Sequence, residues 1–449
     1  MIVDSVLTNA KLYLKGEFVE ACIAVDEGKI QKIGKETHMP KADEKTDLRH
    51  QLVLPGVIDT HVHLRDQEKA YKETFLTGTA AAAAGGVTTV LDMPNNSPVT
   101  MSVQALRERM DIAARRALVN VGFYSEFPAN LDHLDAIVAE GTVGFKLFMG
   151  EQVGGLNIDD DQALKDAFTQ VATLKVPVAV HAEDHTLVKR GTEEAQLAHK
   201  ETMADFLKVH SDNVELTAVQ RLLDIQAEIE NLNLHFCHIS TEKALKDLAK
   251  AKTSGRTLTC EATPHHLLLT KDDYTQLGAK ALTLPPLRTS ESPQALWLGI
   301  TDGTIDSVGS DHAPHTLEEK ESRSIWEVKA GVPGLETTLP LMLTQVHKGK
   351  LTLARALELL SEKPAEIFRL ADKGRIEEGK SADFVVVDFN QKYQIDASKF
   401  KSKAKFSPFD IWDVQGKPLK TFVNGQLIID EGEIVAKPGV GRIVRRAQK

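Results

Sequence analysis

The stretch PGVIDTHVHLRD, residues 55–66, carries the strongest local signal for the fold. Its apolar and β-branched residues predict a strand over Val57–Leu64. His61 and His63 stand two residues apart near the end of that strand, so their side chains point to the same face. Both imidazoles can therefore reach one metal ion, although a lone His-x-His pair is weak evidence for a metal site.

Outside this stretch, apolar β-branched runs alternate with amphipathic helical runs, which predicts repeated βα units around a parallel sheet. Helices are expected between the strands, as over 72–84, 160–174, 214–230 and 241–254. The candidate strands are Val57–Leu64, Val87–Pro94, Leu118–Phe127, Gly144–Met149, Val176–Glu183, Leu234–Ser240, Thr257–Thr263 and Thr304–Asp311. Eight strands with intervening helices over about 300 residues predict an α/β fold, a (β/α)8 TIM barrel, over residues 55–373.

The two ends of the chain have a different pattern, with short alternating strands and glycine turns at Lys15-Gly16 and Glu27-Gly28. Neither end has enough strands to be stable alone. We therefore expect residues 1–54 and 374–449 to pair into one small β-domain, like a β-sandwich, beside the barrel.

Metal-ligand residue types recur at the ends of other predicted strands. They are Lys146 in GFKLFM, His181 in VPVAVHAED, His238 in LHFCHIS and Asp311 in VGSDHAPH. Because active sites of barrels lie at the carboxyl ends of the strands, five strand ends point ligands at one centre. Histidine and carboxylate ligands with open positions suit zinc and similar divalent ions.

Lys146 lies between Phe145 and Leu147 in an apolar strand, where an unpaired ammonium is costly. A lowered pKa would make this amine nucleophilic, and reaction with carbon dioxide would give a carbamate that can bridge two cations. A lysine that extends to solvent or pairs with a carboxylate is an equally good interpretation of the residues alone.

The order of these residues resembles the amidohydrolase superfamily, and within it the chain is similar to dihydroorotases. The similarity spans the whole predicted barrel, and GSDHAPHTLEEK separates this group from most amidohydrolases. The matching stretches are PGVIDTHVHLRD (55–66), KETFLTGTAAAAAGGVTTVLDMPN (72–95), GFKLFMG (144–150), HAED (181–184), CHIS (237–240), CEATPHHLLLT (260–270), GSDHAPHTLEEK (309–320) and GVPGLETTLPLMLT (331–344).

The resemblance implies a site with two Zn²⁺ ions bridged by carboxylated Lys146. It implies that His61, His63 and Asp311 hold one ion and that His181 and His238 hold the other. It further implies that Arg65, Asn95 and His315 grip the carboxylate of the substrate. A hydroxide between the ions would attack the ring carbonyl, and Asp311 would carry its proton to the ring nitrogen. In reverse, the same steps cyclise N-carbamoyl-L-aspartate to L-dihydroorotate in pyrimidine synthesis.

Two alternatives stay open. A hydantoinase or allantoinase would use the same metals on another cyclic amide, but those relatives usually lack an arginine in the position of Arg65. A non-catalytic dihydroorotase-like subunit would be favoured by the loss of a metal ligand, yet all six are present.

Composition excludes several other functions. The formal charge is −10 and there is no basic block, which argues against nucleic acid as a partner. No run approaches the roughly 20 apolar residues of a membrane helix. Three cysteines cannot form a disulfide framework and suggest a cytoplasmic protein. We expect a small-molecule substrate and a homodimer.

Two further expectations concern single segments. Gly150–Asn157 has three glycines directly after a ligand strand, which predicts a lid over the pocket. Cys237 lies in an apolar run and is expected to be a packed core residue. Asp311 is expected to be the only acid at a strand end within the ligand set.

Overall fold

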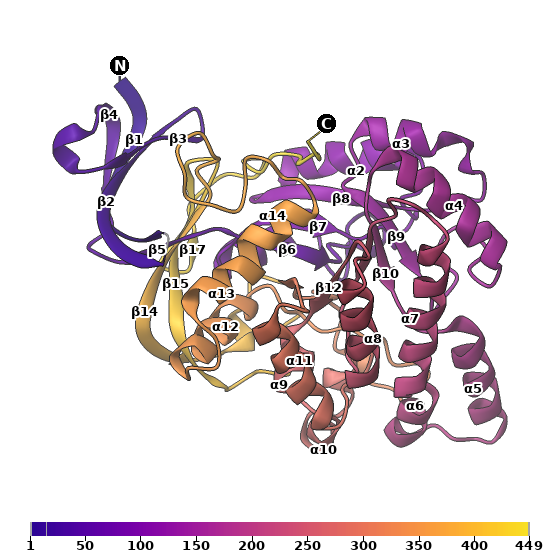
Figure 1. Ribbon diagram of the computed structural model, residues 1–449. Coiled ribbons are helices and arrows are strands. Elements are labelled where there is room, and N and C mark those ends of the chain that lie inside the picture. The colour runs from indigo at the N-terminus through magenta and orange to yellow at the C-terminus, as the bar shows by residue number, and fades with distance from the viewer. Residues whose placement is uncertain (1, 15, 448–449) are drawn as a thin grey trace.

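The computed structural model describes residues 2–14 and 16–447, and it contains a parallel barrel beside a mixed sheet (Figure 1). The predicted TIM barrel is confirmed. Its strands follow one another in chain order around the sheet. They are β6 (Val57–Val62), β7 (Val87–Asp92), β8 (Asn120–Glu126), β9 (Gly144–Phe148), β10 (Val178–His181), β11 (Leu234–Phe236), β12 (Leu258–Ala262) and β13 (Ser307–Val308).

Each observed strand lies inside its predicted range and ends earlier at its carboxyl end. The difference is largest for β11 and β13, where the residues past the strand leave extended geometry. His238 and Asp311 have φ values of 34° and 46°, in the left-handed region that ends a hydrogen-bonded ladder. The candidate ligands therefore lie on the segments directly after the strands as well as in them.

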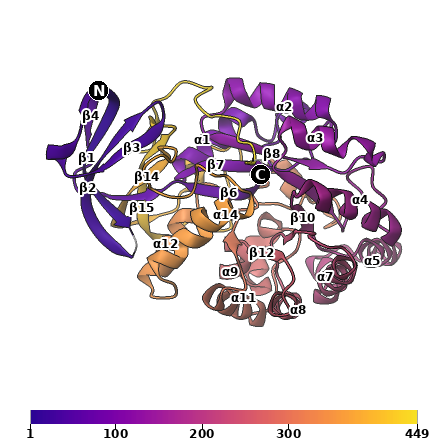
Figure 2. The ribbon, with the colours of Figure 1, turned by 45° about the horizontal axis from the view of Figure 1, so that its top comes forward.

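Helices cover the outside of the barrel (Figures 1 and 2). Several begin at a side-chain cap, such as Thr74 before α1, Ser102 before α2 and Thr241 before α8. The helices are α1 (Phe75–Ala84), α2 (Val103–Arg116), α3 (Leu134–Glu140), α4 (Asp161–Leu174), α5 (His185–Leu197), α6 (Met203–Val209), α7 (Asp212–Ala227), α8 (Glu242–Thr253), α9 (Pro264–Leu268), α10 (Tyr274–Leu277), α11 (Glu291–Asp302), α12 (Thr338–His347), α13 (Leu353–Leu357) and α14 (Lys363–Ile367).

The barrel closes where its first and last strands meet. Val62 forms a parallel bridge with His312, and the His63 N–H donates to the His312 carbonyl at 2.8 Å. Closure buries one continuous apolar core that includes the stacked rings of Phe127 and Phe145.

A nine-stranded mixed sheet is built from both ends of the chain. Near the centre of the sheet, β5 pairs parallel with β1 and antiparallel with β14. The N-terminal and C-terminal segments of the chain are thereby joined in one sheet. Figure 1 shows this sheet to the left of the barrel. Its strands are β1 (Ile2–Leu14), β2 (Glu17–Asp26), β3 (Lys29–Gly34), β4 (Lys41–Asp47), β5 (Leu52–Pro55), β14 (Phe384–Gln394), β15 (Asp413–Val423), β16 (Gln426–Asp430) and β17 (Glu433–Ile434).

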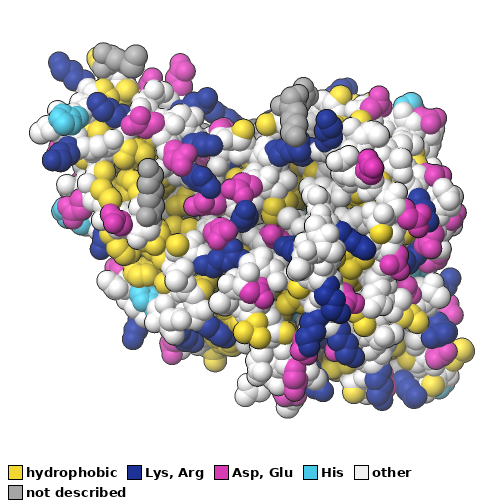
Figure 3. Space-filling view, in the orientation of Figure 1, with side chains coloured by type: hydrophobic (Ala, Val, Ile, Leu, Met, Phe, Trp, Pro, Cys, Tyr) yellow, Lys and Arg dark blue, Asp and Glu magenta, His cyan; other side chains and the backbone are white. Residues whose placement is uncertain are grey.

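Charges of both signs are intermixed on the face drawn in Figure 3, while apolar side chains gather over the mixed sheet. Among the described residues, every helix is too short or too polar to cross a lipid bilayer.

A buried polar junction ties the mixed sheet to the barrel. The Asp383 carboxylate accepts from Lys373 Nζ at 2.7 Å, from Asn120 Nδ2 at 3.1 Å and from the Asn424 N–H at 2.7 Å. Asn120 begins β8, whereas Asp383 and Asn424 flank strands of the mixed sheet. Removing one partner of a buried ion pair leaves an uncompensated charge.

We predict that Asp383→Ala lowers the free energy of unfolding by about 3–5 kcal/mol, because the Lys373 ammonium stays buried without its carboxylate. Urea unfolding followed by circular dichroism measures this change. The control is Glu194→Ala, which breaks an exposed pair with Arg190 at 3.9 Å and should leave stability unchanged within error. Equal stability of the two variants would contradict the proposed importance of the junction.

Candidate active site

The candidate site lies at the carboxyl ends of the barrel strands. His61 lies in β6 and His63 follows that strand by one residue. Lys146 lies in β9 and His181 is the last residue of β10. His238 and Asp311 follow β11 and β13, so the structure brings all six candidate ligands to the same end of the barrel.

Within this end, the side chains form two neighbouring groups. Asp311 Oδ1 lies 3.4 Å from His61 Nε2 and 3.2 Å from His63 Nε2. His181 Nδ1 lies 3.1 Å from His238 Nε2. Donor atoms of His61, His238 and Asp311 all lie within 4.8 Å of one another, which connects the groups.

In three of the histidines, the ring nitrogen that points away from the cluster lies within hydrogen-bond distance of an acceptor oxygen. His61 Nδ1 lies 3.0 Å from Glu261 Oε1, and His63 Nδ1 lies 2.7 Å from Asn95 Oδ1. His181 Nε2 lies 3.0 Å from Glu183 Oε2. Such contacts fix the tautomer, so that the nitrogen facing the cluster keeps its lone pair.

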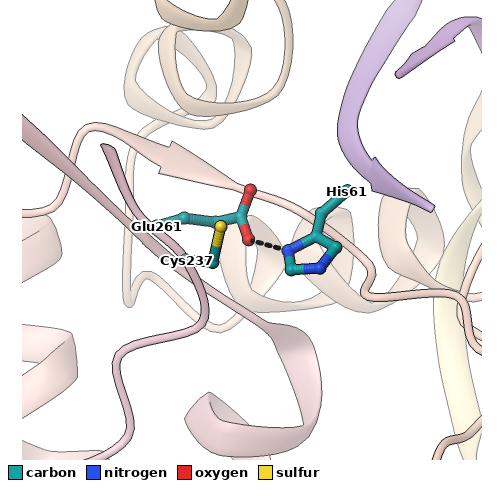
Figure 4. A group of neighbouring side chains, drawn as sticks. All are labelled: His61, Cys237 and Glu261. Carbon is teal, nitrogen blue, oxygen red and sulfur yellow. Dashed lines mark hydrogen bonds and ion pairs between the residues drawn. The ribbon is translucent and has the colours of Figure 1, made fainter. Parts of the chain in front are cut away.

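Glu261 and Cys237 are the residues that the sequence interpretation missed. Glu261, in β12, is fully buried beside His61, and Cys237 lies in the same group (Figure 4). Burial alone would raise the pKa of Glu261, but the neighbouring His61 and His235 hold it below its ordinary value. Asp311 is therefore not the only acid at a strand end. In the stretch CEATPHH, Glu261 stands near the end of a strand, where the other motifs have their candidate ligands.

The expectation that Cys237 is only a packed core residue is too narrow. Its thiol is buried, but Lys146 Nζ donates to Cys237 Sγ at 3.2 Å. Strand β11 ends at Phe236, so Cys237 is the first residue past the strand. Burial raises the pKa of Cys237 to about 12, so the thiol is neutral.

The donor set fits a divalent metal ion. Burial lowers the pKa of His61, and it lowers the pKa values of His63 and His238 more strongly, so these rings are neutral at pH 7. His238 Nδ1 is buried and has no hydrogen-bond partner among the described residues. Neutral imidazole nitrogens beside a carboxylate are the ligands that zinc takes in proteins.

Lys146 is fully buried, and within the described chain no carboxylate lies within ion-pair distance of its Nζ atom. Besides Cys237, the nitrogen lies 4.9 Å from the centre of the Phe148 ring. A free ammonium is poorly compensated in these surroundings, and a carbamate on Nζ would replace its positive charge with a negative one.

Arg65, Asn95 and His315 lie beside the histidine cluster. Arg65 Nη2 lies 3.3 Å from His315 Nε2, and Arg65 Nε is buried without a partner among the described residues. Only 6% of Arg65 is exposed, and no described acid forms an ion pair with it. A buried guanidinium without an ion-pair partner is suited to bind an anion.

His315, which lies beside Arg65, is a neutral ring. Burial, followed by the charges of Arg65 and Lys72, lowers the pKa of His315 to about 2. Its Nδ1 lies 3.1 Å from Glu319 Oε2, and Lys72 Nζ lies 2.8 Å from Glu319. The ring is thereby fixed between Arg65 and Glu319.

The Gly150–Asn157 segment follows β9 at the rim of the site. The Gln152 side chain donates to the carbonyls of Gly154 and Leu156 at 2.7 and 2.6 Å. The Gly155 N–H donates to the Phe127 carbonyl at 2.8 Å. The segment is thus fastened in the structure as described, and its action as a lid stays a prediction.

Comparisons with known proteins agree with this geometry. A model of the amidohydrolase family matches residues 52–428. A dihydroorotase of Methanosarcina mazei is 37% identical, over 98% of this chain and 97% of its own length. An L-hydantoinase of Paenarthrobacter aurescens is 34% identical, over 99% of this chain and 98% of its own length.

Among solved structures, an L-hydantoinase (dihydropyrimidinase) from Arthrobacter aurescens superposes with a TM-score of 0.94 at 33% identity. That alignment covers 99% of this chain and 100% of the other. The family match spans the whole barrel and the strands β5, β14 and β15 of the mixed sheet, and the relatives align over nearly their full lengths. The chain therefore belongs to the amidohydrolase family.

Proposed function

We propose that this chain is a dihydroorotase, which converts N-carbamoyl-L-aspartate and L-dihydroorotate into each other in pyrimidine synthesis. The observation that carries the proposal is the buried guanidinium of Arg65 beside the histidine cluster, which forms no ion pair among the described residues. Dihydroorotate is a cyclic amide with a carboxylate on the ring, so it fits a site that presents both features. The similarity to several dihydroorotases at 35–38% identity supports the same choice.

We further propose two zinc ions as cofactors. His61, His63 and Asp311 would hold one ion, and His181 and His238 would hold the other, with carboxylated Lys146 shared between them. When bound, the ions supply positive charge that polarises the ring carbonyl and lowers the pKa of water from 15.7 towards about 7.

Asp311 is the proposed proton carrier. Its carboxylate is buried and lies within 3.4 Å of both His61 Nε2 and His63 Nε2, at the centre of the cluster. In hydrolysis it accepts a proton from the attacking water at a carboxylate oxygen. It then delivers that proton to the ring nitrogen that leaves the carbonyl carbon.

Arg65, Asn95 and His315 orient the ring for this step. The planar guanidinium of Arg65 can donate two parallel hydrogen bonds to one carboxylate. The Asn95 oxygen faces His63 Nδ1, which leaves the amide N–H groups of Asn95 for the substrate. The carboxylate of the substrate lies away from the bond that breaks. Binding it therefore fixes which carbonyl of the ring faces Asp311.

The second candidate is an L-hydantoinase-type hydrolase, which the similarity to the Arthrobacter structure favours. Hydantoin rings need no carboxylate, so this function leaves the unpaired charge of Arg65 unexplained. A non-catalytic subunit is less well supported because all six candidate ligands converge. A homodimer and a cytoplasmic location stay predictions.

We predict that the zinc-loaded protein hydrolyses dihydroorotate faster than hydantoin or allantoin, and that Arg65→Met removes this preference. The variant should lose about 2–5 kcal/mol in kcat/KM for dihydroorotate, the usual cost of breaking a buried charge pair. Steady-state rates and zinc content by mass spectrometry measure the two effects. Unchanged dihydroorotate kinetics in Arg65→Met would reject the carboxylate contact, and faster wild-type hydrolysis of hydantoin would favour the second candidate.

We predict that Asp311→Asn lowers kcat for dihydroorotate by about 10²–10⁴-fold while it keeps much of its metal. The amide keeps the shape and one ligating oxygen but cannot accept the proton. Asp272→Asn, at an exposed position, is the matched control and should behave like wild type. A variant with two zinc ions and a nearly wild-type rate would show that another group carries the proton.

We predict that Lys146 is carboxylated in the metal-loaded protein, because its buried Nζ has no acidic partner among the residues that the structure describes. High-resolution crystallographic density should show a planar three-atom extension on Nζ. Metal-free protein should also regain activity faster as bicarbonate is added together with zinc. An unmodified ammonium beside two fully occupied metal sites would disprove the modification.

A further inference from the structure

The turn that follows β6 has an unusual backbone. Arg65, Asp66 and Gln67 have φ values of 55°, 56° and 48°, and none of them is glycine. Three successive non-glycine residues in the left-handed region are rare, and such a conformation persists only when its surroundings hold it. This turn carries Arg65, so whatever holds the turn also aims the guanidinium.

A buried arginine from α2 holds the inner side of this turn. Arg109 is 1% exposed, and its Nη1 donates to the Arg65 carbonyl at 2.9 Å and to Gln67 Oε1 at 2.8 Å. Its Nη2 donates to Asp92 Oδ2 at 2.5 Å. The other oxygen of Asp92 accepts the Leu64 N–H at 2.8 Å, so the Arg109–Asp92 pair grips the backbone on both sides of Arg65.

The outer side of the turn is held by Asp66. Its carboxylate accepts from the N–H groups of Gln67 and Phe75 at 2.7 and 2.8 Å. The Phe75 ring lies 4.7 Å from the Arg109 guanidinium and closes the space beneath it. Helix α2, which carries Arg109, lies on the outside of the barrel next to α1 and β8 (Figure 2).

We infer that Arg109 is a positioning residue that sets the preference for ring substrates with a carboxylate by holding the 65–67 turn. Arg109 acts through the Arg65 carbonyl, which fixes the start of the Arg65 side chain and holds its guanidinium beside His315. The inference rests on the proposed function, because it takes Arg65 as the group that binds the carboxylate.

The test is a double-mutant cycle of Arg65→Met and Arg109→Met, with dihydroorotate and dihydrouracil as substrates. Dihydrouracil has the same ring without the carboxylate. Arg109→Met should raise KM for dihydroorotate about tenfold, within the range of couplings between contacting residues, and lower kcat less than about threefold. In the Arg65→Met background it should raise KM no further.

Two further variants keep the test decisive. Arg109→Lys keeps the charge but cannot bridge Asp92 and the Arg65 carbonyl, so its KM should lie between those of wild type and Arg109→Met. Gln67→Ala removes one hydrogen-bond acceptor of Arg109. It takes the place of Arg109→Met in the double-mutant cycle if Arg109→Met fails to fold. Arg115→Met, at an exposed position on α2, is the control and should leave both KM and kcat unchanged.

A purely structural role for Arg109 gives a different pattern. Rates on dihydroorotate and dihydrouracil would then fall together, and the effects of Arg65→Met and Arg109→Met would be additive, which would overturn the inference alone. An unchanged KM in Arg65→Met would overturn the inference and the carboxylate contact of the proposed function together. Zinc content and melting temperature, measured for every variant, identify losses caused by incomplete folding.

Discussion

Closure of the barrel between β6 and β13 is the constraint on which the rest of the molecule depends. The Val62–His312 bridge and the hydrogen bond from His63 to His312 join strands that are about 250 residues apart in the chain. Because of this contact, Asp311 lies against His61 and His63. Without it, the carboxylate and the two imidazoles would belong to opposite edges of an open sheet.

The closed barrel can then hold charges and strained residues that an isolated segment could not. Lys146 and Glu261 are fully buried, and Arg65 is nearly so. Arg65, His238 and Asp311 each adopt positive φ, at a cost of about 1–3 kcal/mol per residue. The large apolar core around them offsets these costs.

The same scaffold serves relatives with different names, so the fold alone does not choose the substrate. The choice depends on the groups around the metal-ligand cluster. In this chain one such group is the buried guanidinium of Arg65, which forms no ion pair with an acid among the described residues. Under the proposed function, the carboxylate of a ring substrate would supply the compensating negative charge.

The sequence by itself determined the α/β class, the eight barrel strands and the family. These features follow from hydrophobic periodicity and from residue types at strand ends, which are local properties of the chain. It also supplied the candidate ligands, because parallel strands of one barrel end at the same rim.

Only the tertiary structure decided how the residues behind those ligands are arranged. Glu261 contacts His61 across 200 residues of chain, and Arg109 reaches the Arg65 carbonyl from a helix 44 residues away. The apolar run around Cys237 indicated only a packed core residue, but β11 ends one residue earlier and the thiol accepts a hydrogen bond from Lys146 Nζ. Such contacts depend on where each strand stops and how helices pack on the barrel. Both are set by long-range packing, which a pattern of neighbouring residues does not encode.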